Sequence, residues 1–182
     1  MAKLVGIPGS LRRDSFNRAL LNAAAKLVPE GSELNVLSIN DVPLFNEDVE
    51  RDEGTPDSVM ALRHAVAASD GIIISTPEYN AGVPGVLKNA LDWLSRQVEG
   101  EAPVFTGKPL AMMGATPGGL GTALAQAAWL PTLRNLRVRY WTGGGNFTLS
   151  RAFAEFSDGE LSDEKQEHLA KFVGGFCKHV DE

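Results

Sequence analysis

Hydroxyl, amide and guanidinium side chains are concentrated in residues 9–17, which read GSLRRDSFN. Ser10, Ser15 and Asn17 can donate side-chain hydrogen bonds. Arg12 adds a planar cation at close range. A helix beginning at Ser15 would add unpaired backbone N–H groups and the positive end of its dipole. This combination suits a phosphomonoester; the alternative is that Ser15 is only an N-cap and the arginines belong to a solvated turn.

Two common phosphate-binding fingerprints are missing from the chain. No GxGxxG motif follows a strand, and no GxxxxGK[ST] motif occurs. The first is typical of dinucleotide-binding folds, and the second is typical of P-loop proteins. The ligand expected at residues 9–17 is therefore a mononucleotide or a sugar phosphate.

Two further loops, TPEYNAGVPG at 76–85 and ATPGGLGT at 115–122, are rich in turn residues. In the first, a planar heterocycle would meet backbone N–H groups, the Asn80 amide and the Tyr79 ring. In the second, glycines let the backbone approach a flat ligand. Ordinary turns, in which Pro, Asn and Gly are the expected residues, remain the alternative for both loops. Beside a phosphate-binding loop they would form a slot with one charged end and one flat, amide-lined end, which suits FMN.

Short apolar runs that alternate with segments of helical periodicity must position these loops. The apolar runs predict strands at 4–7, 33–39, 71–75, 110–113 and 138–142. The periodic segments predict helices at 15–28, 58–69, 84–96, 122–136 and 162–180. Five strands alternating with five helices predict right-handed crossovers and a doubly wound α/β sheet with helices on both faces.

The three unusual loops follow the first, third and fourth predicted strands, whereas the loop after the second strand is long and acidic. A parallel sheet with strand order 2-1-3-4-5 would bring the three loops together at its carboxyl edge, which is the flavodoxin-like arrangement. The six-stranded dinucleotide-binding order would need a sixth strand, and the sequence pattern does not predict one.

Composition limits the classes of protein to which the chain can belong. The chain has 182 residues and a net charge of −6, so no overall field attracts nucleic acid or an anionic membrane. The single cysteine, Cys177, excludes an internal disulfide and a CxxC pair. The apolar stretch in residues 1–10 is too short for a signal peptide, and no run approaches the ~20 residues of a membrane span. We expect one cytoplasmic domain covering residues 1–182.

Three blocks of sequence resemble the NADPH-dependent FMN reductase family. They are GSLRRDSFNRAL at 9–20, PEYNAGVPGVLKNALDWLS at 77–95 and ATPGGLGT at 115–122. This flavodoxin-fold group includes bacterial quinone and chromate reductases and azoreductase-like enzymes. The similarity extends to PLFNED at 43–48 and SDGIIIS at 69–75. The resemblance therefore covers nearly the whole chain, and it implies a single flavodoxin-like FMN-binding domain.

The resemblance assigns residues of this chain to the cofactor. The FMN phosphate would be held by Ser10, Arg12, Ser15, Phe16 and Asn17. The isoalloxazine would be lined by Pro77, Glu78, Tyr79 and Asn80. Its other edge would be closed by Thr116, Pro117, Gly118 and Gly119.

The resemblance also implies an activity, that of an FMN-dependent NAD(P)H oxidoreductase. Hydride would pass from NADPH or NADH to bound FMN, and electrons would pass on to quinone, flavin, azo or chromate-type acceptors by a ping-pong mechanism. Flavin N5 would carry the chemistry, so no catalytic side chain is expected. The family further implies a homodimer or homotetramer with the flavin near the subunit seam.

Two alternatives on the same fold remain open from the residues themselves. A non-catalytic FMN electron carrier of the flavodoxin type usually clamps the ring between two aromatic side chains, and the predicted flavin loops supply only Tyr79. The second alternative is a protein that binds phosphorylated metabolites and holds no flavin. No metal site is expected, because His168 and His179 lie eleven positions apart on one predicted helix, about 16 Å along its axis.

The predicted helix at 84–96 has more apolar residues than one buried face requires. Two explanations are open at this point. The excess residues can pack deep in the core, or they can form an interface between subunits.

Overall fold

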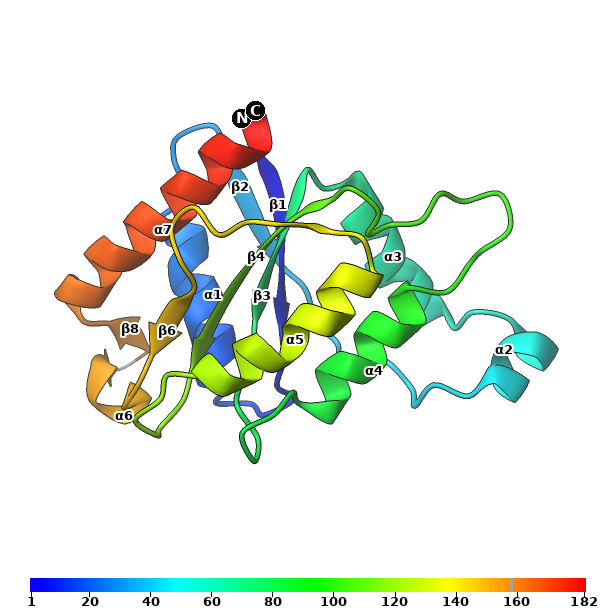
Figure 1. Ribbon diagram of the computed structural model, residues 1–182, viewed down its shortest axis with the longest axis horizontal. Coiled ribbons are helices and arrows are strands. Elements are labelled where there is room, and N and C mark those ends of the chain that lie inside the picture. The colour runs from blue at the N-terminus through cyan, green and yellow to red at the C-terminus, as the bar shows by residue number, and fades with distance from the viewer. Residues whose placement is uncertain (158) are drawn as a thin grey trace.

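The computed structural model describes residues 1–157 and 159–182, which form a parallel sheet flanked by helices (Figure 1). The strands run in the order β2-β1-β3-β4-β5, and β6 also pairs with β4. They are β1 (Lys3–Pro8), β2 (Glu33–Val36), β3 (Gly71–Ser75), β4 (Pro109–Ala115), β5 (Arg139–Tyr140) and β6 (Phe147–Leu149). All pairings within this sheet are parallel, which confirms the predicted flavodoxin-like, doubly wound fold.

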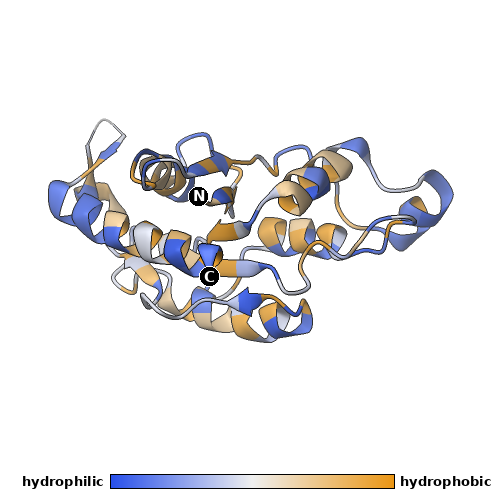
Figure 2. Cartoon of the chain, turned by 90° about the horizontal axis from the view of Figure 1, so that it is seen from above, coloured by the Kyte–Doolittle hydropathy of each residue, from blue (hydrophilic) through white to orange (hydrophobic). Residues whose placement is uncertain are grey.

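Helices cover both faces of the sheet. They are α1 (Phe16–Lys26), α2 (Glu47–Glu53), α3 (Asp57–Ala68), α4 (Gly85–Leu94), α5 (Ala123–Asn135), α6 (Ala152–Glu155) and α7 (Asp163–Asp181). Successive side chains of a strand point to opposite faces, so β3 contributes to two cores. Ile73 packs with residues of α1 and α7, whereas Ile72 and Ile74 pack with residues of α3, α4 and α5. Figure 2 shows hydrophobic residues along the central strands and hydrophilic ones on the outer sides of the helices.

The fifth strand position is divided between two segments, so the prediction of five strands is wrong in this detail. β5 pairs with the first residues of β4, and β6 pairs with Met113–Ala115 on the same edge. The intervening chain folds over the Trp141 indole, since a side chain at Gly144 would come within 2.6 Å of that ring. Trp141 packs in turn on Phe172 and Phe176 of α7. Tertiary packing of one aromatic residue therefore interrupts the strand.

Several short elements were not predicted. The acidic segment after β2 contains α2, whose N-cap Asn46 accepts a hydrogen bond from the Asp48 N–H (2.9 Å) and which buries no residue. The tight hairpin of β7 (Phe156–Ser157) and β8 (Glu160–Leu161) follows α6. Helix α2 lacks an apolar face and the other elements span four residues or fewer, so hydrophobic periodicity carries no signal for them.

The apolar excess of α4 is used inside the chain. Leu87, Leu91 and Trp93 are buried. The Trp93 Nε1 donates to the Pro43 carbonyl (2.9 Å), and its ring meets the edge of Phe45 at 4.9 Å between centroids. Core packing therefore accounts for the apolar pattern of this helix. In the described part of the chain, no helix combines the length and the apolar character needed to cross a membrane.

Candidate functional site

The three loops singled out from the sequence meet at the carboxyl edge of β1, β3 and β4, at the bottom of Figure 1. Two glycines allow this close approach. The Gly9 N–H donates to the Ser75 carbonyl (2.8 Å), and a Cβ at Gly9 would lie 2.7 Å from Pro77. A Cβ at Gly114 would lie 2.0 Å from the Thr122 hydroxyl oxygen. A larger residue at either position would push the loops apart.

A cavity of about 60 Å³ lies where the loops meet. It is lined by Ser10, Arg12, Ser15, Phe16, Asn17, Pro77, Glu78, Tyr79, Ala115, Thr116 and Pro117. Of the predicted site residues, only Asn80, Gly118 and Gly119 are outside this lining, and Ala115 is the one lining residue that was not predicted. Ligand pockets commonly enclose about 300–1,000 Å³, so this cavity is too small for a whole cofactor. Its size suits a small group such as a phosphate. The remainder of a cofactor would lie over the open surface beside it.

The phosphate end of the site is the start of α1. Ser15 is the N-cap, and its Oγ accepts a hydrogen bond from the Arg18 N–H (3.3 Å). The backbone N–H groups of Phe16 and Asn17 donate to no acceptor within residues 1–157 and 159–182. They lie at the positive end of the helix dipole, beside the exposed Arg12. Ser15 is thus an N-cap, and the helix start still offers free donors for an anion.

Asn17 lines the cavity, but its side chain is engaged inside the protein. The Asn17 Nδ2 donates to the Ala115 carbonyl (2.9 Å), and its Oδ1 accepts from the Ala115 N–H (3.0 Å). The Ser75 hydroxyl donates to the same oxygen (3.0 Å). These buried bonds join the first turn of α1 to the ends of β3 and β4. The amide therefore positions the helix start relative to the other two loops.

The second loop contains a two-residue hairpin. Tyr79 and Gly82 exchange backbone hydrogen bonds of 3.2 and 3.0 Å. The central residues Asn80 and Ala81 have φ values of 51° and 58°, which is the left-handed conformation of a type I′ turn. The hairpin presents the Tyr79 ring at the site with 46% of the residue exposed. Its hydroxyl lies 3.5 Å from the Ser10 Oγ, which links the first two loops.

Glu78 joins the second loop to the third. Its Oε2 accepts hydrogen bonds from the backbone N–H groups of Leu124 (2.9 Å) and Ala125 (3.1 Å) in the first turn of α5. The preceding residue Thr122 has a left-handed φ of 69° and makes no side-chain cap bond. Glu78 thus caps α5 across 46 positions of sequence, a role that no local pattern could have revealed.

The third loop is held by the segment that follows β5. Thr116 donates its N–H to Leu149 and accepts from the Ala152 N–H, both at 3.0 Å. These bonds bring α6 and Phe153 to the site. Phe153 is 72% exposed, and its ring meets the edge of the Phe16 ring at 4.9 Å between centroids. No sequence motif predicted this aromatic residue, because it lies on a four-residue helix outside the three loops.

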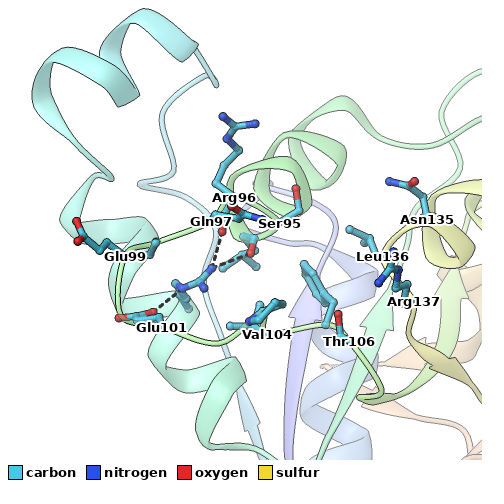
Figure 3. A pocket seen from close by; sticks show the side chains of 15 residues that line it. Ser95, Arg96, Gln97, Glu99, Glu101, Val104, Thr106, Asn135, Leu136 and Arg137 are labelled. Carbon is cyan, nitrogen blue, oxygen red and sulfur yellow. Dashed lines mark hydrogen bonds and ion pairs between the residues drawn. The ribbon is translucent and has the colours of Figure 1, made fainter.

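A larger cavity, of about 740 Å³, lies at the opposite edge of the sheet, where Glu101, Val104 and Arg137 surround it (Figure 3). The Arg63 guanidinium in its wall is 1% exposed and donates to the carbonyls of Leu94, Arg96 and Ala102 at the end of α4 and in the following loop. It is also paired with Glu101. This arginine is fully engaged in fixing the loop, so the cavity carries no unsatisfied polar group from Arg63.

Other reactive side chains lie away from the three loops. Cys177 is buried in α7, where desolvation raises the pKa of its thiol and favours the unreactive form. His64 lies 3.1 Å from Glu101 on the surface of α3, at the amino edge of the sheet. Neither group lies where the three loops meet, so neither is assigned to the site.

Comparison with known proteins agrees with the geometry. The family model described as NADPH-dependent FMN reductase matches residues 2–153. An NAD(P)H-dependent FMN reductase of Pseudomonas aeruginosa is 41% identical over 167 residues, which are 92% of this chain and 88% of that protein. A quinone reductase of Pseudomonas putida is 36% identical over 175 residues, or 96% of this chain and 92% of the relative.

A solved structure is similar over the whole fold. FerB, a flavoenzyme NAD(P)H:(acceptor) oxidoreductase from Paracoccus denitrificans, has a TM-score of 0.86 and 35% sequence identity, covering 100% of this chain and 98% of its own. The matches confirm the family resemblance, the enzyme class and the FMN and NAD(P)H cofactors predicted from the sequence. The chain belongs to the NADPH-dependent FMN reductase family.

Proposed function

We propose that FMN binds with its phosphate at the start of α1 and its ring over the hairpin of the second loop and the backbone of the third. The observation that carries this proposal is the pair of free N–H groups of Phe16 and Asn17 beside Arg12, at the converging loops. Free donors at a helix start, together with a guanidinium, are the groups that a phosphate needs. At Gly119 a Cβ would meet nothing within 4 Å, so the third loop offers open backbone to a flat ligand.

Each group of residues has a distinct task in this proposal. Ser10, Arg12 and Ser15 bind the phosphate, while Asn17 and Glu78 hold the loops in place. When bound, FMN supplies a two-electron centre that accepts hydride from NAD(P)H and reduces a second substrate. The protein has to orient the ring and leave one face of it accessible, because both substrates must reach it.

We infer a ping-pong order from the openness of the site. The enclosed part is about 60 Å³ and Tyr79 is half exposed, so NAD(P)H and the acceptor would use the same open surface in turn. The acceptors we propose are quinones, flavins, azo compounds and chromate. The name of the Pseudomonas putida relative, a quinone reductase, supports quinones first.

Steady-state kinetics of the FMN-loaded protein test the function and the order. NADPH oxidation is measured at several fixed concentrations of a benzoquinone, and a ping-pong order gives parallel double-reciprocal lines. Intersecting lines would contradict the order but not the activity. Turnover near the background rate, with FMN bound, would contradict the reductase itself.

Phe153 adds a second exposed aromatic side chain near the site, so a non-catalytic FMN electron carrier is the second candidate function. A ring clamped on both faces would be shielded from nicotinamide. Anaerobic mixing of the holoprotein with NADPH, followed at the FMN absorbance maximum, gives rapid bleaching for a reductase and almost none for a carrier. If the apoprotein is colourless and does not take up added FMN, the result would instead support a protein that binds other phosphorylated metabolites.

We further propose that residues 1–182 form one FMN-binding domain, that it works in the cytoplasm and that it assembles as a homodimer or homotetramer. The assembly rests on the family resemblance, since the apolar residues of α4 are already used within the chain. Light scattering at micromolar concentration measures the mass directly. A mass of one 19.5 kDa chain would overturn this part of the proposal.

A further inference from the structure

A second hollow, of about 480 Å³, opens beside the cavity proposed for the FMN phosphate. It is lined by Leu11, Arg12, Arg13, Arg18 and Asn40. Arg12 also lines the first cavity, so the two share a wall. Arg13 belongs to the loop before α1, while Arg18 lies in α1 and Asn40 lies in the segment after β2. Three guanidinium groups, two from the loop before α1 and one from α1 itself, therefore surround one hollow next to the cofactor site.

The positive charge of this hollow is uncompensated. None of the three arginines forms an ion pair with a residue that the structure describes, although the chain has a net charge of −6. In contrast, Arg51, Arg63 and Arg96 are each paired with carboxylates. Asp14 belongs to the same loop, yet it does not line the hollow.

One of the guanidinium groups is also held in place. The Arg18 Nη2 donates to the Asn40 Oδ1 at 3.4 Å, which anchors it to the wall and leaves its other N–H groups available. A planar guanidinium binds phosphate oxygens through paired hydrogen bonds. Three such groups, with no acidic lining residue, match a phosphomonoester carrying close to two negative charges.

We propose that this hollow binds the 2′-phosphate of NADPH and makes the protein selective for NADPH over NADH. The inference rests on the proposed function, because it needs a nicotinamide over the FMN ring. A dinucleotide that extends from that ring past the FMN phosphate would reach the neighbouring hollow, because Arg12 lines both cavities. NADPH and NADH differ only in the 2′-phosphate, and arginines recognise that group in other NADP-binding proteins.

Binding of two nucleotide fragments tests the proposal without turnover. Isothermal titration of the FMN-loaded protein compares 2′,5′-ADP, which carries the 2′-phosphate, with 5′-AMP, which lacks it. We expect 2′,5′-ADP to bind at least about tenfold more tightly. Arg13→Gln and Arg18→Gln should each raise its Kd about tenfold, the usual effect of losing one charged hydrogen-bond partner, and leave the Kd of 5′-AMP unchanged.

Kinetics give a second readout, in which each variant lowers kcat/KM for NADPH about tenfold and leaves the value for NADH unchanged. Arg139→Gln is the matched control, since Arg139 is an exposed arginine at the start of β5 and lines neither cavity. Equal losses with both nucleotides would assign the hollow to the shared pyrophosphate and overturn the proposal. Weaker FMN binding in Arg13→Gln would assign it to the FMN phosphate, with the same consequence.

Failure of the proposed function would look different. In that case the wild-type chain would not take up FMN, or NADPH and NADH would both fail to reduce it. If the wild-type chain instead binds FMN and is reduced by NADPH and NADH at equal rates, only the role of the arginine-lined hollow is overturned.

Discussion

At the scale of single residues, the site separates groups that are free to bind from groups that hold the loops. The Phe16 and Asn17 N–H groups and the Arg12 guanidinium have no partner in the described chain. The Asn17 side chain, in contrast, makes three buried hydrogen bonds. Side chains of one motif can therefore have opposite tasks, and substitutions should reveal them as losses of affinity or losses of stability.

Replacing Arg12 by alanine should weaken FMN binding. The substitution removes a charged donor from the phosphate end while the fold keeps its contacts, so the Kd for FMN should rise about tenfold. Quenching of flavin fluorescence during titration of the apoprotein measures it. Arg134→Ala removes an exposed arginine from the last turn of α5 and serves as the control. Equal affinities for wild type and Arg12→Ala would contradict the assigned contact.

Replacing Asn17 by alanine should instead reduce stability. The Ala115 peptide and the Ser75 hydroxyl would lose their buried partner, at a cost of about 2–4 kcal/mol in the free energy of unfolding. Urea denaturation of the apoprotein measures the loss. Asn135→Ala, at an exposed position at the end of α5, should change the value by less than about 0.5 kcal/mol. A loss no larger than that of the control would refute the positioning role.

At the scale of elements, the loops of the site contain a strained turn and a helix start that is capped by a side chain from another loop. The second loop holds Ala81 at a φ of 58°, although the left-handed conformation costs an alanine about 1–2 kcal/mol. The Glu78 carboxylate caps α5, and the Arg63 guanidinium donates hydrogen bonds to the carbonyls of Leu94 and Arg96 at the end of α4. The N-cap residue of α5, Thr122, makes no side-chain cap bond, so Glu78 supplies the acceptor from another loop.

Ala81→Gly should stabilise the protein. Glycine relieves the left-handed strain, and its larger entropy loss on folding offsets only part of the gain, so we expect about 0.5–1 kcal/mol. Thermal denaturation followed by circular dichroism measures the change in Tm. Ala128→Gly, at an exposed helical position in α5, should act in the opposite direction by about 1 kcal/mol. A lower Tm for Ala81→Gly would contradict the strained turn.

Arg63→Met should destabilise the chain and spare the cofactor site. The change leaves the carbonyls of Leu94 and Arg96 without a donor and Glu101 without its buried partner, so we expect a loss of about 2–4 kcal/mol. Urea denaturation measures it, and FMN titration should give an unchanged Kd because Arg63 lies at the other edge of the sheet. Arg51→Met, which removes only exposed ion pairs, should leave the free energy of unfolding close to the wild-type value.

At the scale of the whole molecule, the two edges of the sheet have different properties. Unpaired donors and cations gather at the carboxyl edge, where a ligand can satisfy them, and the buried arginine of the amino edge is already satisfied by the protein. Open α/β sheets generally bind ligands at the carboxyl ends of their strands. Stability and binding should therefore respond to different substitutions and different conditions.

Acid should destabilise the amino edge. Hydrogen bonds from Arg63 and then His64 lower the pKa of Glu101 from its ordinary value of 4.5. The stabilisation by this carboxylate is full above 4.5 and is lost as the pH falls through the lowered pKa of the folded protein. Tm should therefore fall below pH 4.5, and Glu101→Gln should make that fall shallower.

The acid profile has a simple control. Glu53→Gln removes an exposed carboxylate that forms no ion pair with the described residues, and its profile should follow the wild type. Parallel profiles for wild type and Glu101→Gln at constant ionic strength would contradict the contribution of Glu101.

The sequence alone determined the fold class, the strand order and the three loops of the site. Continuous apolar runs such as GIIIS, helical periods and turn residues act over a few neighbouring positions, so they can be read directly from the chain. The lining of the cavity by residues such as Ser10, Tyr79 and Thr116 follows from that order, since parallel strands present their carboxyl ends at one edge.

Only the tertiary structure decided which side chains are free to bind a ligand. Asn17 finds Ala115 across 98 positions and Glu78 finds α5 across 46, while packing around Trp141 splits the last strand. The hollow lined by Arg13 and Arg18 likewise depends on the segment after β2. Such pairings are set by the packing of whole elements, and no local periodicity encodes a partner so far away in the sequence.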